Sequence, residues 1–482
     1  MRSVIFTNKI FIGLSFVLIA GYIILFSYFS ITRLLSFNAH YYDLGIMDQA
    51  VYNTSRGRIL ELTDPNSQTN ISRLAIHFDP ILAFFAPFYW ILPDPIILLI
   101  GQSVILGLGG IAVLLIAQHI LNSRFLALIS LFLYLNYYPL QLSNMFEFHA
   151  VTIATTTLLF AFYFLALFPL KKKRNNFIVG MIFVILTLLT KENTPLILIA
   201  LCGYLSIKRK EKKVYLFTGL SIFVFFILVV FIMIPFFRKS QSFALSYYDY
   251  HHPLSLLRWL FSLRSIRYMI SLTAPLAFLP FLAPMQFMII IPELFINLLS
   301  SNDNMRAMYY HYTALIVPFT IIATIYGLKR LLSYVRIPLK NNAIGLLLVG
   351  VSIVVNIQSG FTDYASYQIH EESLNMVRIW RQKLKDDRIK VSTTGSIAPF
   401  FTQRKYFYNF FFDPAYQTLG MSEEEIEKNI DKHTIADYII IYDKDIYPDD
   451  ELRRKFYEEL RTNEDYAFVE GKENIEVYRR VK

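Results

Sequence analysis

Long apolar runs dominate the first three quarters of the chain and alternate with short polar connections. A run of about 18 or more apolar residues is typical of a helix that crosses a membrane. The pattern predicts about eleven such helices, over residues 10–30, 95–118, 124–141, 150–169, 176–190, 194–207, 214–237, 266–283, 284–299, 312–328 and 342–358. The sequence therefore predicts an all-α polytopic membrane domain over residues 1–364.

The pattern changes after this point. Charged helical stretches at 423–432 and 451–461 alternate with short apolar runs that are typical of strands, at 389–392, 438–442 and 476–478. Such alternation predicts a small, soluble α/β domain over residues 365–482. Gly395 in this region belongs to no glycine-rich nucleotide-binding pattern, so we assign no nucleotide cofactor to it.

Composition supports the membrane class. Hydrophobic residues make up 55% of the 482 positions and charged residues only 17%, against about 25% charged residues in soluble domains. Cys202 is the single cysteine, which excludes a disulfide framework. The net charge of +10 comes with no basic stripe among stacking aromatics, so we expect no nucleic-acid partner.

The distribution of charge predicts the orientation. Clusters of Lys and Arg at 171–174, 208–213 and 329–330, together with the basic N-terminus, fall on one side of an eleven-span bundle. That side is the cytoplasm by the positive-inside rule. The N-terminus is then cytoplasmic, and the C-terminal domain lies on the extracytoplasmic face of the plasma (inner) membrane. Most acids of residues 1–364 gather on this outer face, which suggests either a site there or simply longer outer loops.

The first outer loop, residues 31–94, is the longest polar connection, and loops of this length are usually functional. Asp43 to Ser55 reads as a short amphipathic helix along the membrane surface, with Asp43 as N-cap and Gly57 at its end. Asp48 would lie roughly 140° around this helix from Asp43. The two acids therefore have different expected roles, and Asp43 is either a helix cap or a catalytic group.

A second short helix is predicted over residues 81–92, because Asp79 before Pro80 is a helix-start signal. His77 precedes this start. It is either a surface histidine beside a cap, or part of a polar pair with Asp79 that faces a phosphate or a metal ion.

Three further polar groups lie on the predicted outer side, and each has two interpretations. Glu147 and His149 flank the start of a span, as interfacial residues or as site residues. Lys191-Glu192 lies between two apolar helices, where ionisable groups are usually paired or functional. Arg306 and His311 lie in an aromatic-rich segment, which is either an aromatic belt or a contact for a lipid phosphate.

The order of these features resembles the GT-C glycosyltransferase superfamily, and within it an uncharacterised prokaryotic branch of predicted membrane proteins with a domain of unknown function. The resemblance covers residues 1–360 well. It is carried by Tyr42-Asp43-Leu44-Gly45 with Asp48-Gln49, His77-Phe78-Asp79-Pro80, Phe146-Glu147-Phe148-His149 and Lys191-Glu192.

The resemblance implies an integral-membrane transferase that uses a polyprenyl-phosphate-linked sugar on the extracytoplasmic face. It implies Asp43 as catalytic base or metal ligand, with Asp43 and Asp48 as candidate ligands of a divalent cation such as Mg²⁺ or Mn²⁺. The expected partners are the lipid-linked donor and membrane lipids. The residues expected to bind substrate are Asp48, His77, Asp79, Glu147, His149, Lys191, Glu192, Arg306 and His311.

Two other classes remain open at this point. A transporter or lipid flippase would place ionisable residues at mid-membrane and show an internal repeat. The sequence offers chiefly Glu293 as such a residue. A non-catalytic envelope assembly protein would use the C-terminal domain to bind a partner. The sugar, the acceptor and the oligomeric state do not follow from the sequence.

Overall fold

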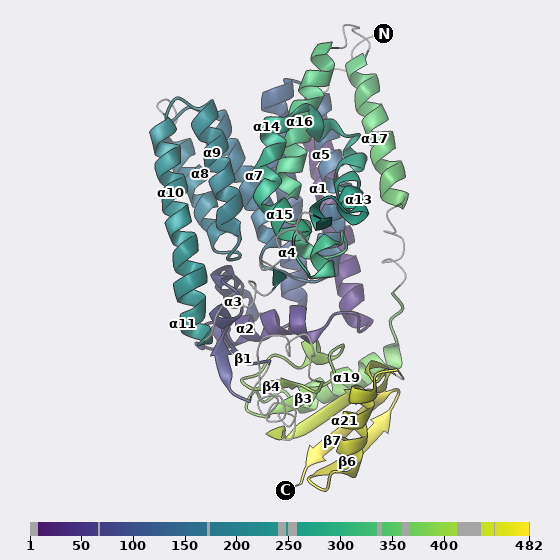
Figure 1. Cartoon of the computed structure of the whole chain (residues 1–482). Coiled ribbons are helices and arrows are strands. Elements are labelled where there is room, and N and C mark those ends of the chain that lie inside the picture. The colour runs from purple at the N-terminus through teal and green to yellow at the C-terminus, as the bar shows by residue number, and fades with distance from the viewer. Residues whose placement is uncertain are drawn as a thin grey trace.

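A computed structural model describes most of the chain (Figure 1). The described residues are 8–65, 68–170, 174–239, 247–248, 258–334, 340–358, 367–411, 435–447 and 449–481. The predicted helix at 423–432 lies outside these residues.

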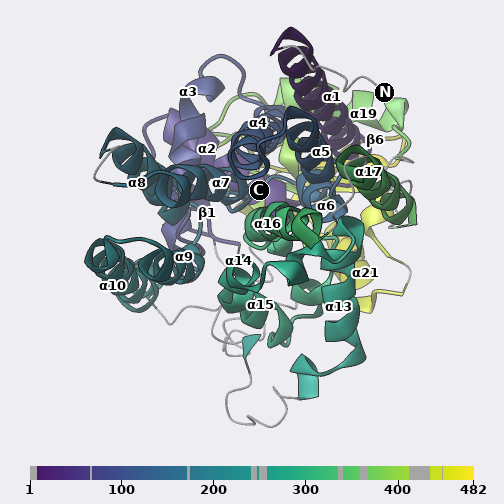
Figure 2. The same cartoon turned by 90° about the horizontal axis from the view of Figure 1, so that it is seen from above.

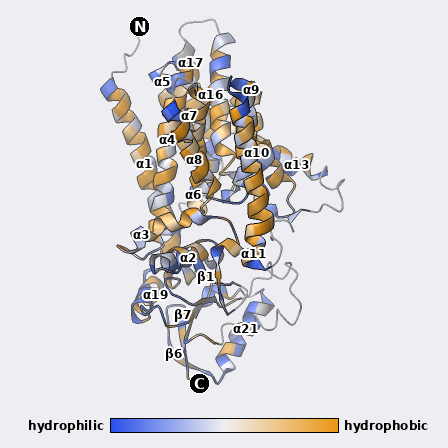
Figure 3. Cartoon of the chain, turned by 90° about the vertical axis from the view of Figure 1, so that its left-hand side faces the viewer, coloured by the Kyte–Doolittle hydropathy of each residue, from blue (hydrophilic) through white to orange (hydrophobic). Residues whose placement is uncertain are grey.

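A bundle of apolar helices forms the upper part of the molecule (Figure 1). Helices α8, α9 and α10 lie on one flank and α17 on the opposite one (Figure 2), and hydrophobic residues cover most of the bundle (Figure 3). Its helices are α1 (Asn8–Leu35), α4 (Ile96–Leu121), α5 (Arg124–Leu135), α6 (Tyr138–Phe146), α7 (Thr152–Leu167), α8 (Arg174–Leu188), α9 (Thr194–Lys208), α10 (Lys212–Leu228), α11 (Ile234–Arg238), α13 (Leu263–Thr273), α14 (Pro284–Phe287), α15 (Ile291–Leu298), α16 (Val317–Tyr334) and α17 (Lys340–Gln358).

Local sequence explains where these helices end. Asn122 adopts a left-handed conformation that ends α4, and the Ser123 side chain accepts a hydrogen bond from the Leu126 amide to begin α5. A Cβ at Gly327 would collide with the Leu279 carbonyl, so a glycine lets α16 approach this turn closely. Such small residues at close crossings are typical of membrane helix packing.

Three helices among the described residues are long and apolar enough to cross a membrane: α1, α4 and the continuous segment Lys212–Arg238. The pair α5 and α6 is bent by 42° and counts as a fourth if it is one broken span. The remaining apolar helices are shorter. Each predicted span coincides with helical segments, and the count of eleven spans stays a prediction.

Several predicted spans are not single helices: 124–141 is divided between α5 and α6, 284–299 between α14 and α15, and 266–283 is interrupted by turns. Residues 266–283 were expected to be continuous, but α13 ends at Thr273, and Ala277 and Phe278 both have positive φ angles. Two short 3₁₀ turns, Ala274–Leu276 and Leu279–Leu282, replace the helix there. Prolines at the start of each turn remove amide donors that a continuous α-helix would use.

The first outer loop lies below the bundle (Figure 1). It contains a π-helical turn (Tyr41–Gly45), α2 (Ile46–Ser55), β1 (Glu61–Thr63), β2 (Asn70–Ser72), a 3₁₀ helix (Pro80–Phe85) and α3 (Ala86–Tyr89). Strands β1 and β2 pair antiparallel.

The prediction of an amphipathic helix on the membrane surface is wrong in two respects. Asp43 is not an N-cap, because it lies inside the π-helical turn that precedes α2. Every residue of α2 from Ile46 to Asn53 is buried, since the helix lies between the bundle and the C-terminal region instead of on an open surface. The periodicity of its apolar residues showed one packed face but could not show the second.

The C-terminal region confirms the predicted combination of strands and helices. It contains α19 (Glu371–Lys383), β3 (Val391–Thr393), β4 (Phe407–Asn409), β5 (Tyr438–Tyr442), α21 (Glu451–Thr462), β6 (Tyr466–Lys472) and β7 (Ile475–Arg480). The strand order is β4-β3-β5-β7-β6. Strand β3 runs parallel to β4 and β5, and β7 runs antiparallel to β5 and β6.

One hydrophobic core joins the end of α1, the first outer loop and the C-terminal sheet. It includes Leu34, Leu44, Val51, Phe407 and Ile440. The predicted domain boundary at residues 364 and 365 lies outside the described residues. The shared core shows that the two regions, although distant in sequence, are packed together.

Asp48 is buried within this core. Its carboxylate accepts hydrogen bonds from the hydroxyls of Tyr89 and Thr402, each at 2.6 Å, and from the Gln403 amide. Burial raises its pKa to about 7, although the hydrogen bonds from Thr402 and Tyr89 oppose this shift. Asp48 therefore links the outer loop to the C-terminal region.

The substitution Asp48→Ala tests this link. It removes the acceptor of buried donors, each of which costs about 1–3 kcal/mol when left unpaired, so we expect the free energy of unfolding to fall by about 3 kcal/mol. Because the folded pKa of Asp48 is raised, its stabilising contribution declines as pH rises toward about 7. The loss in Tm of the detergent-solubilised protein should therefore be larger at acidic than at alkaline pH. Asp465→Ala, at an exposed position, is the control, and an equal Tm for both variants would contradict the role of Asp48.

Candidate functional site

Asp43 lies at the junction of the helical bundle and the C-terminal region. The π-helical turn that carries it closes with a hydrogen bond from the Gly45 amide to the His40 carbonyl, 3.1 Å long. Single π-turns are rare and occur frequently at functional sites. The Asp43 side chain is 34% exposed, whereas its partner His149 is buried. The carboxylate is therefore accessible from one side and supported from the other.

His149 provides that support. Its Nε2 lies 3.0 Å from Oδ1 of Asp43, and its backbone amide donates to Oε1 of Gln102. Gln102 also donates to the carbonyl oxygens of Asn144 and Glu147. This network, from α4 to the loop before α7, fixes the segment that places the imidazole beside Asp43.

Glu147 holds the other side of the Asp43 turn. Its carboxylate accepts hydrogen bonds from the backbone amides of His40 and Leu44. Arg33, near the end of α1, lies 3.6 Å from this carboxylate and donates to the hydroxyls of Tyr309 and Tyr367 at 2.7 and 3.0 Å. The arrangement is a buried contact of Arg33 with Glu147 whose hydrogen bonds reach the backbone around Asp43.

The two neighbouring carboxyl groups have pKa values shifted in opposite directions. Burial opposes ionisation of Asp43, but the hydrogen bond from His149 and the positive charges of His149, His40 and Arg33 lower its pKa. Burial and the charge of Asp43 raise the pKa of Glu147 to about 8, against the effect of Arg33. Asp43 is thus the ionised member, which is the state that a general base requires.

A row of aromatic and basic side chains continues away from Asp43. The rings of His149 and His311 stack with centroids 3.7 Å apart, and His311 contacts the ring of Tyr312 at 4.3 Å. The ammonium group of Lys191 lies 5.7 Å from the centroid of the Tyr312 ring. Among the described residues, no carboxylate forms an ion pair with Lys191. The charge of Lys191 still acts on Glu192 and Glu293, but its ammonium is not held in an ion pair with either of them.

His77 and Glu192 form a separate pair. Nδ1 of His77 lies 2.9 Å from Oε1 of Glu192, and the Phe78 amide donates to the same carboxylate. Burial lowers the pKa of His77, whereas the positive groups around Glu192, chiefly His77, overcome burial and lower the Glu192 pKa to about 2. The charge of Lys191 also lowers the Glu192 pKa, and the hydrogen-bond partner of the carboxylate is His77.

Asp79 does not cap a helix, contrary to expectation. Its side chain makes no capping hydrogen bond and instead binds Nε and Nη2 of Arg73, with a shortest distance of 2.8 Å. Both side chains are buried. The structure therefore gives Asp79 a place in the internal packing of the outer loop, apart from Asp43.

Arg306 also has an internal partner. Its guanidinium lies 2.6 Å from Oδ1 of Asp303, which Arg264 contacts as well, and it packs over the ring of Trp259 at 5.3 Å. Of the two cations predicted to hold a phosphate, Lys191 is thus the one without a paired acid among the described residues.

The structure does not bring Asp43 and Asp48 together as a pair of metal ligands. Both oxygens of Asp48 already accept hydrogen bonds from Tyr89, Thr402 and Gln403. Among the described residues, no three His, Cys, Asp or Glu side chains lie close enough together to hold a metal ion. The hydrogen bonds of Asp48 occupy both of its carboxylate oxygens, and a divalent cation at Asp43 stays a prediction.

Sequence reasoning missed Arg33 and its two tyrosines. The sequence contains one indication of Arg33: it follows an apolar run on the side of the membrane where the positive-inside rule predicts few basic residues. Tyr309 and Tyr367 gave no such signal, because their hydroxyls reach Arg33 from 276 and 334 positions away.

Comparisons with known proteins agree with this architecture. A family described as "Predicted membrane protein (DUF2079)" matches residues 33–477. No curated protein matches the chain in sequence.

Among solved structures, the chain is similar to ArnT from Cupriavidus metallidurans, crystallised with undecaprenyl phosphate. The TM-score is 0.50 and the identity 12%, and the alignment covers 96% of this chain and 98% of that one. The similarity confirms the resemblance to GT-C glycosyltransferases at the level of the fold. The match over nearly the whole length identifies the chain as a member of the DUF2079 family of predicted membrane proteins.

Proposed function

We propose that the protein is an integral-membrane glycosyltransferase that transfers a sugar from a polyprenyl-phosphate-linked donor. The observation that carries the proposal is the ionised, partly exposed Asp43 beside His149, close to the basic row that ends at Lys191. The fold adds support, because the similar protein ArnT was crystallised with undecaprenyl phosphate. The site would face the extracytoplasmic side of the plasma membrane.

The proposed reaction assigns one step to Asp43. The acceptor hydroxyl oxygen forms a bond to the anomeric carbon of the sugar, while the bond from that carbon to the donor phosphate oxygen breaks. Asp43 takes the proton of the hydroxyl, and polyprenyl phosphate leaves with the bonding electron pair. A carboxylate held ionised by neighbouring donors is suited to this role.

Lys191 is proposed to bind the phosphate that leaves. Positive charge near the leaving oxygen stabilises the charge that develops there, and the Lys191 ammonium has no ion-paired acid among the described residues. Arg306 is proposed to make a weaker contribution, since Asp303 already neutralises part of its charge.

The remaining predicted site residues are proposed to act as positioning residues. Glu147 and His149 hold the turn and the orientation of Asp43, and His311 supports His149 by stacking. Glu192 and His77 are proposed to shape the region around Lys191. Asp48 and Asp79 are proposed to maintain the fold of the outer loop, because their carboxylates are bound to protein donors.

The substitution Asp43→Asn removes the proposed base with little change in shape. General-base catalysis typically contributes 10²–10⁴-fold, so we expect the transfer rate to fall by roughly this factor. The measurement is the release of undecaprenyl phosphate from a panel of undecaprenyl-phosphate-linked monosaccharides in the presence of a panel of saccharide acceptors, followed by mass spectrometry. Asp465→Asn is the control, and an unchanged rate in Asp43→Asn would overturn the assignment of the base.

The substitution His149→Ala should move the pH profile of transfer. Without the His149 hydrogen bond, the pKa of Asp43 rises toward the value expected for a buried acid. Asp43 is active as a base only when it is ionised. The acid limb of the kcat/KM profile of His149→Ala should therefore shift to higher pH, and the variant should recover activity on the alkaline side. His119→Ala, in α4, is the matched control. A uniform loss of rate at every pH would contradict the positioning role of His149.

The substitution Lys191→Met keeps the length of the side chain and removes its charge. One charge-assisted hydrogen bond contributes about 1.5–3 kcal/mol, so we expect undecaprenyl phosphate to bind at least about tenfold more weakly. Lys208→Met, at the other end of α9, is the control. Equal affinities of both variants and the unaltered protein, measured by titration in detergent, would exclude Lys191 as the phosphate contact.

A further inference from the structure

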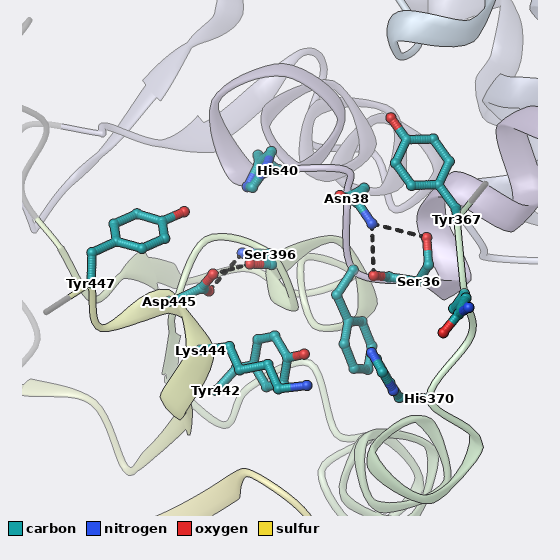
Figure 4. A pocket seen from close by; sticks show the side chains of 12 residues that line it. Ser36, Asn38, His40, Tyr367, His370, Ser396, Tyr442, Lys444, Asp445 and Tyr447 are labelled. Atoms are coloured by element: carbon teal, nitrogen blue, oxygen red, sulfur yellow. Dashed lines mark hydrogen bonds between the residues drawn. The ribbon is translucent and has the colours of Figure 1, made fainter. Parts of the chain in front are cut away.

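A cavity lies next to the Asp43 turn, between the end of α1 and the C-terminal sheet (Figure 4). Its volume is about 480 Å³, which is within the range of pockets that bind small molecules. One wall comes from residues 36–40 of the outer loop, and another from the loops that follow β3 and β5. Two regions that are distant in sequence thus build it together.

Fixed polar groups line two sides of the cavity. The Asp445 carboxylate is buried and accepts hydrogen bonds from the hydroxyl and the backbone amide of Ser396, the latter at 3.0 Å. The Asn38 amide donates to the carbonyl and the hydroxyl oxygen of Ser36. Figure 4 shows these groups on both sides of the open space. Carboxylate, amide and hydroxyl groups in fixed positions are the hydrogen-bond partners that a sugar ring requires.

Aromatic rings provide the other surfaces. The ring of Tyr442 packs edge-on against Phe37 with centroids 5.0 Å apart, and both line the cavity. Tyr447 is 48% exposed, and the guanidinium of Arg453 lies 4.6 Å from its ring centroid. A rigid aromatic face with a polar edge can pack against the C–H face of a pyranose while its hydroxyl binds a sugar hydroxyl.

Lys444 is the exposed cation of the cavity, and no described carboxylate forms an ion pair with it. His40 and His370 also line the space, whereas Asp445 is buried and bound by Ser396. Lys444 is therefore the side chain that would bind an anionic group of a ligand, while hydroxyl groups of the same ligand would bind the fixed polar side chains.

His40 connects the cavity to the candidate base. It lines the cavity, and its backbone amide and carbonyl take part in the hydrogen bonds that hold the Asp43 turn. A molecule bound in the cavity would therefore contact the residue whose backbone holds the Asp43 turn.

From these observations we propose that the cavity is the acceptor site and binds an anionic saccharide, such as a uronic acid residue, through Lys444 and the tyrosine faces. The assignment as acceptor site rests on the proposed transferase function. The binding of an anionic sugar does not, and it can be tested without turnover.

The test is a titration of the full-length protein in detergent with D-glucuronate and D-glucose, followed by saturation-transfer NMR at millimolar concentrations. Inorganic phosphate, which has no carbon-bound proton, is added as a competitor, and its affinity is measured from the loss of the glucuronate signal. We expect glucuronate to bind more tightly than either of the other two. Lys444→Ala should weaken glucuronate binding about tenfold, as expected for the loss of one charge-assisted contact, and leave glucose binding unchanged. Lys472→Ala, an exposed lysine in the edge strand β6, is the matched control.

Three results would overturn the proposal: no binding of glucuronate, equal binding of phosphate and glucuronate, or an unchanged affinity in Lys444→Ala. The Asp43→Asn variant separates this proposal from the transferase function. If that variant binds glucuronate normally while neither it nor the unaltered protein transfers sugar, the saccharide site stands and the proposed reaction fails.

Discussion

The packing of the first outer loop against the C-terminal sheet is the constraint on which the rest of the site depends. The loop packs on the end of the bundle, through residues such as Leu98 and Phe148, and on the C-terminal sheet as well. Its buried apolar residues, such as Leu44 and Val51, share one core with Phe407 and Ile440 of the sheet. A backbone hydrogen bond of 3.1 Å from the Tyr41 amide to the Gly395 carbonyl then fixes the start of the Asp43 turn.

Within this frame, buried ionisable groups are arranged in separate pairs instead of one cluster. Arg33 with Glu147, His77 with Glu192, and Arg73 with Asp79 each satisfy their own charge or hydrogen-bonding capacity. Asp43 differs because one side of its carboxylate is held by His149 and the other is exposed. This difference in environment distinguishes Asp43, as the candidate reactive carboxylate, from the buried carboxylates that support the structure around it.

The sequence was informative where a single periodic signal decides the structure. The long apolar runs predicted the helices, and short apolar runs predicted β3, β5 and β7. It failed where tertiary packing decides. The apolar face of α2 was visible, but its second buried face depends on Thr402 and Gln403, more than 350 positions away. Asp79 carried a capping signature, yet a bidentate contact with Arg73 replaced the cap.

The same limit applies to the candidate site. Asp43, His149 and Lys191 were named individually from their residue types and predicted side of the membrane. Their connection through stacked rings could not be derived, because it depends on how α7, α9 and the segment before α16 meet. Arg33 was overlooked since a cation at the end of an apolar helix is usually an interfacial anchor.

The hydrogen bond between Tyr41 and Gly395 has a consequence for how such proteins diversify. The C-terminal region is not an exchangeable module that can be replaced to change the ligand, because it also holds the backbone beside Asp43. A graft from a relative would have to bring residues 36–45 with it, or lose the geometry of the turn. Inherited changes in the loop after β3 and in the segment after α1 should therefore occur together across the family.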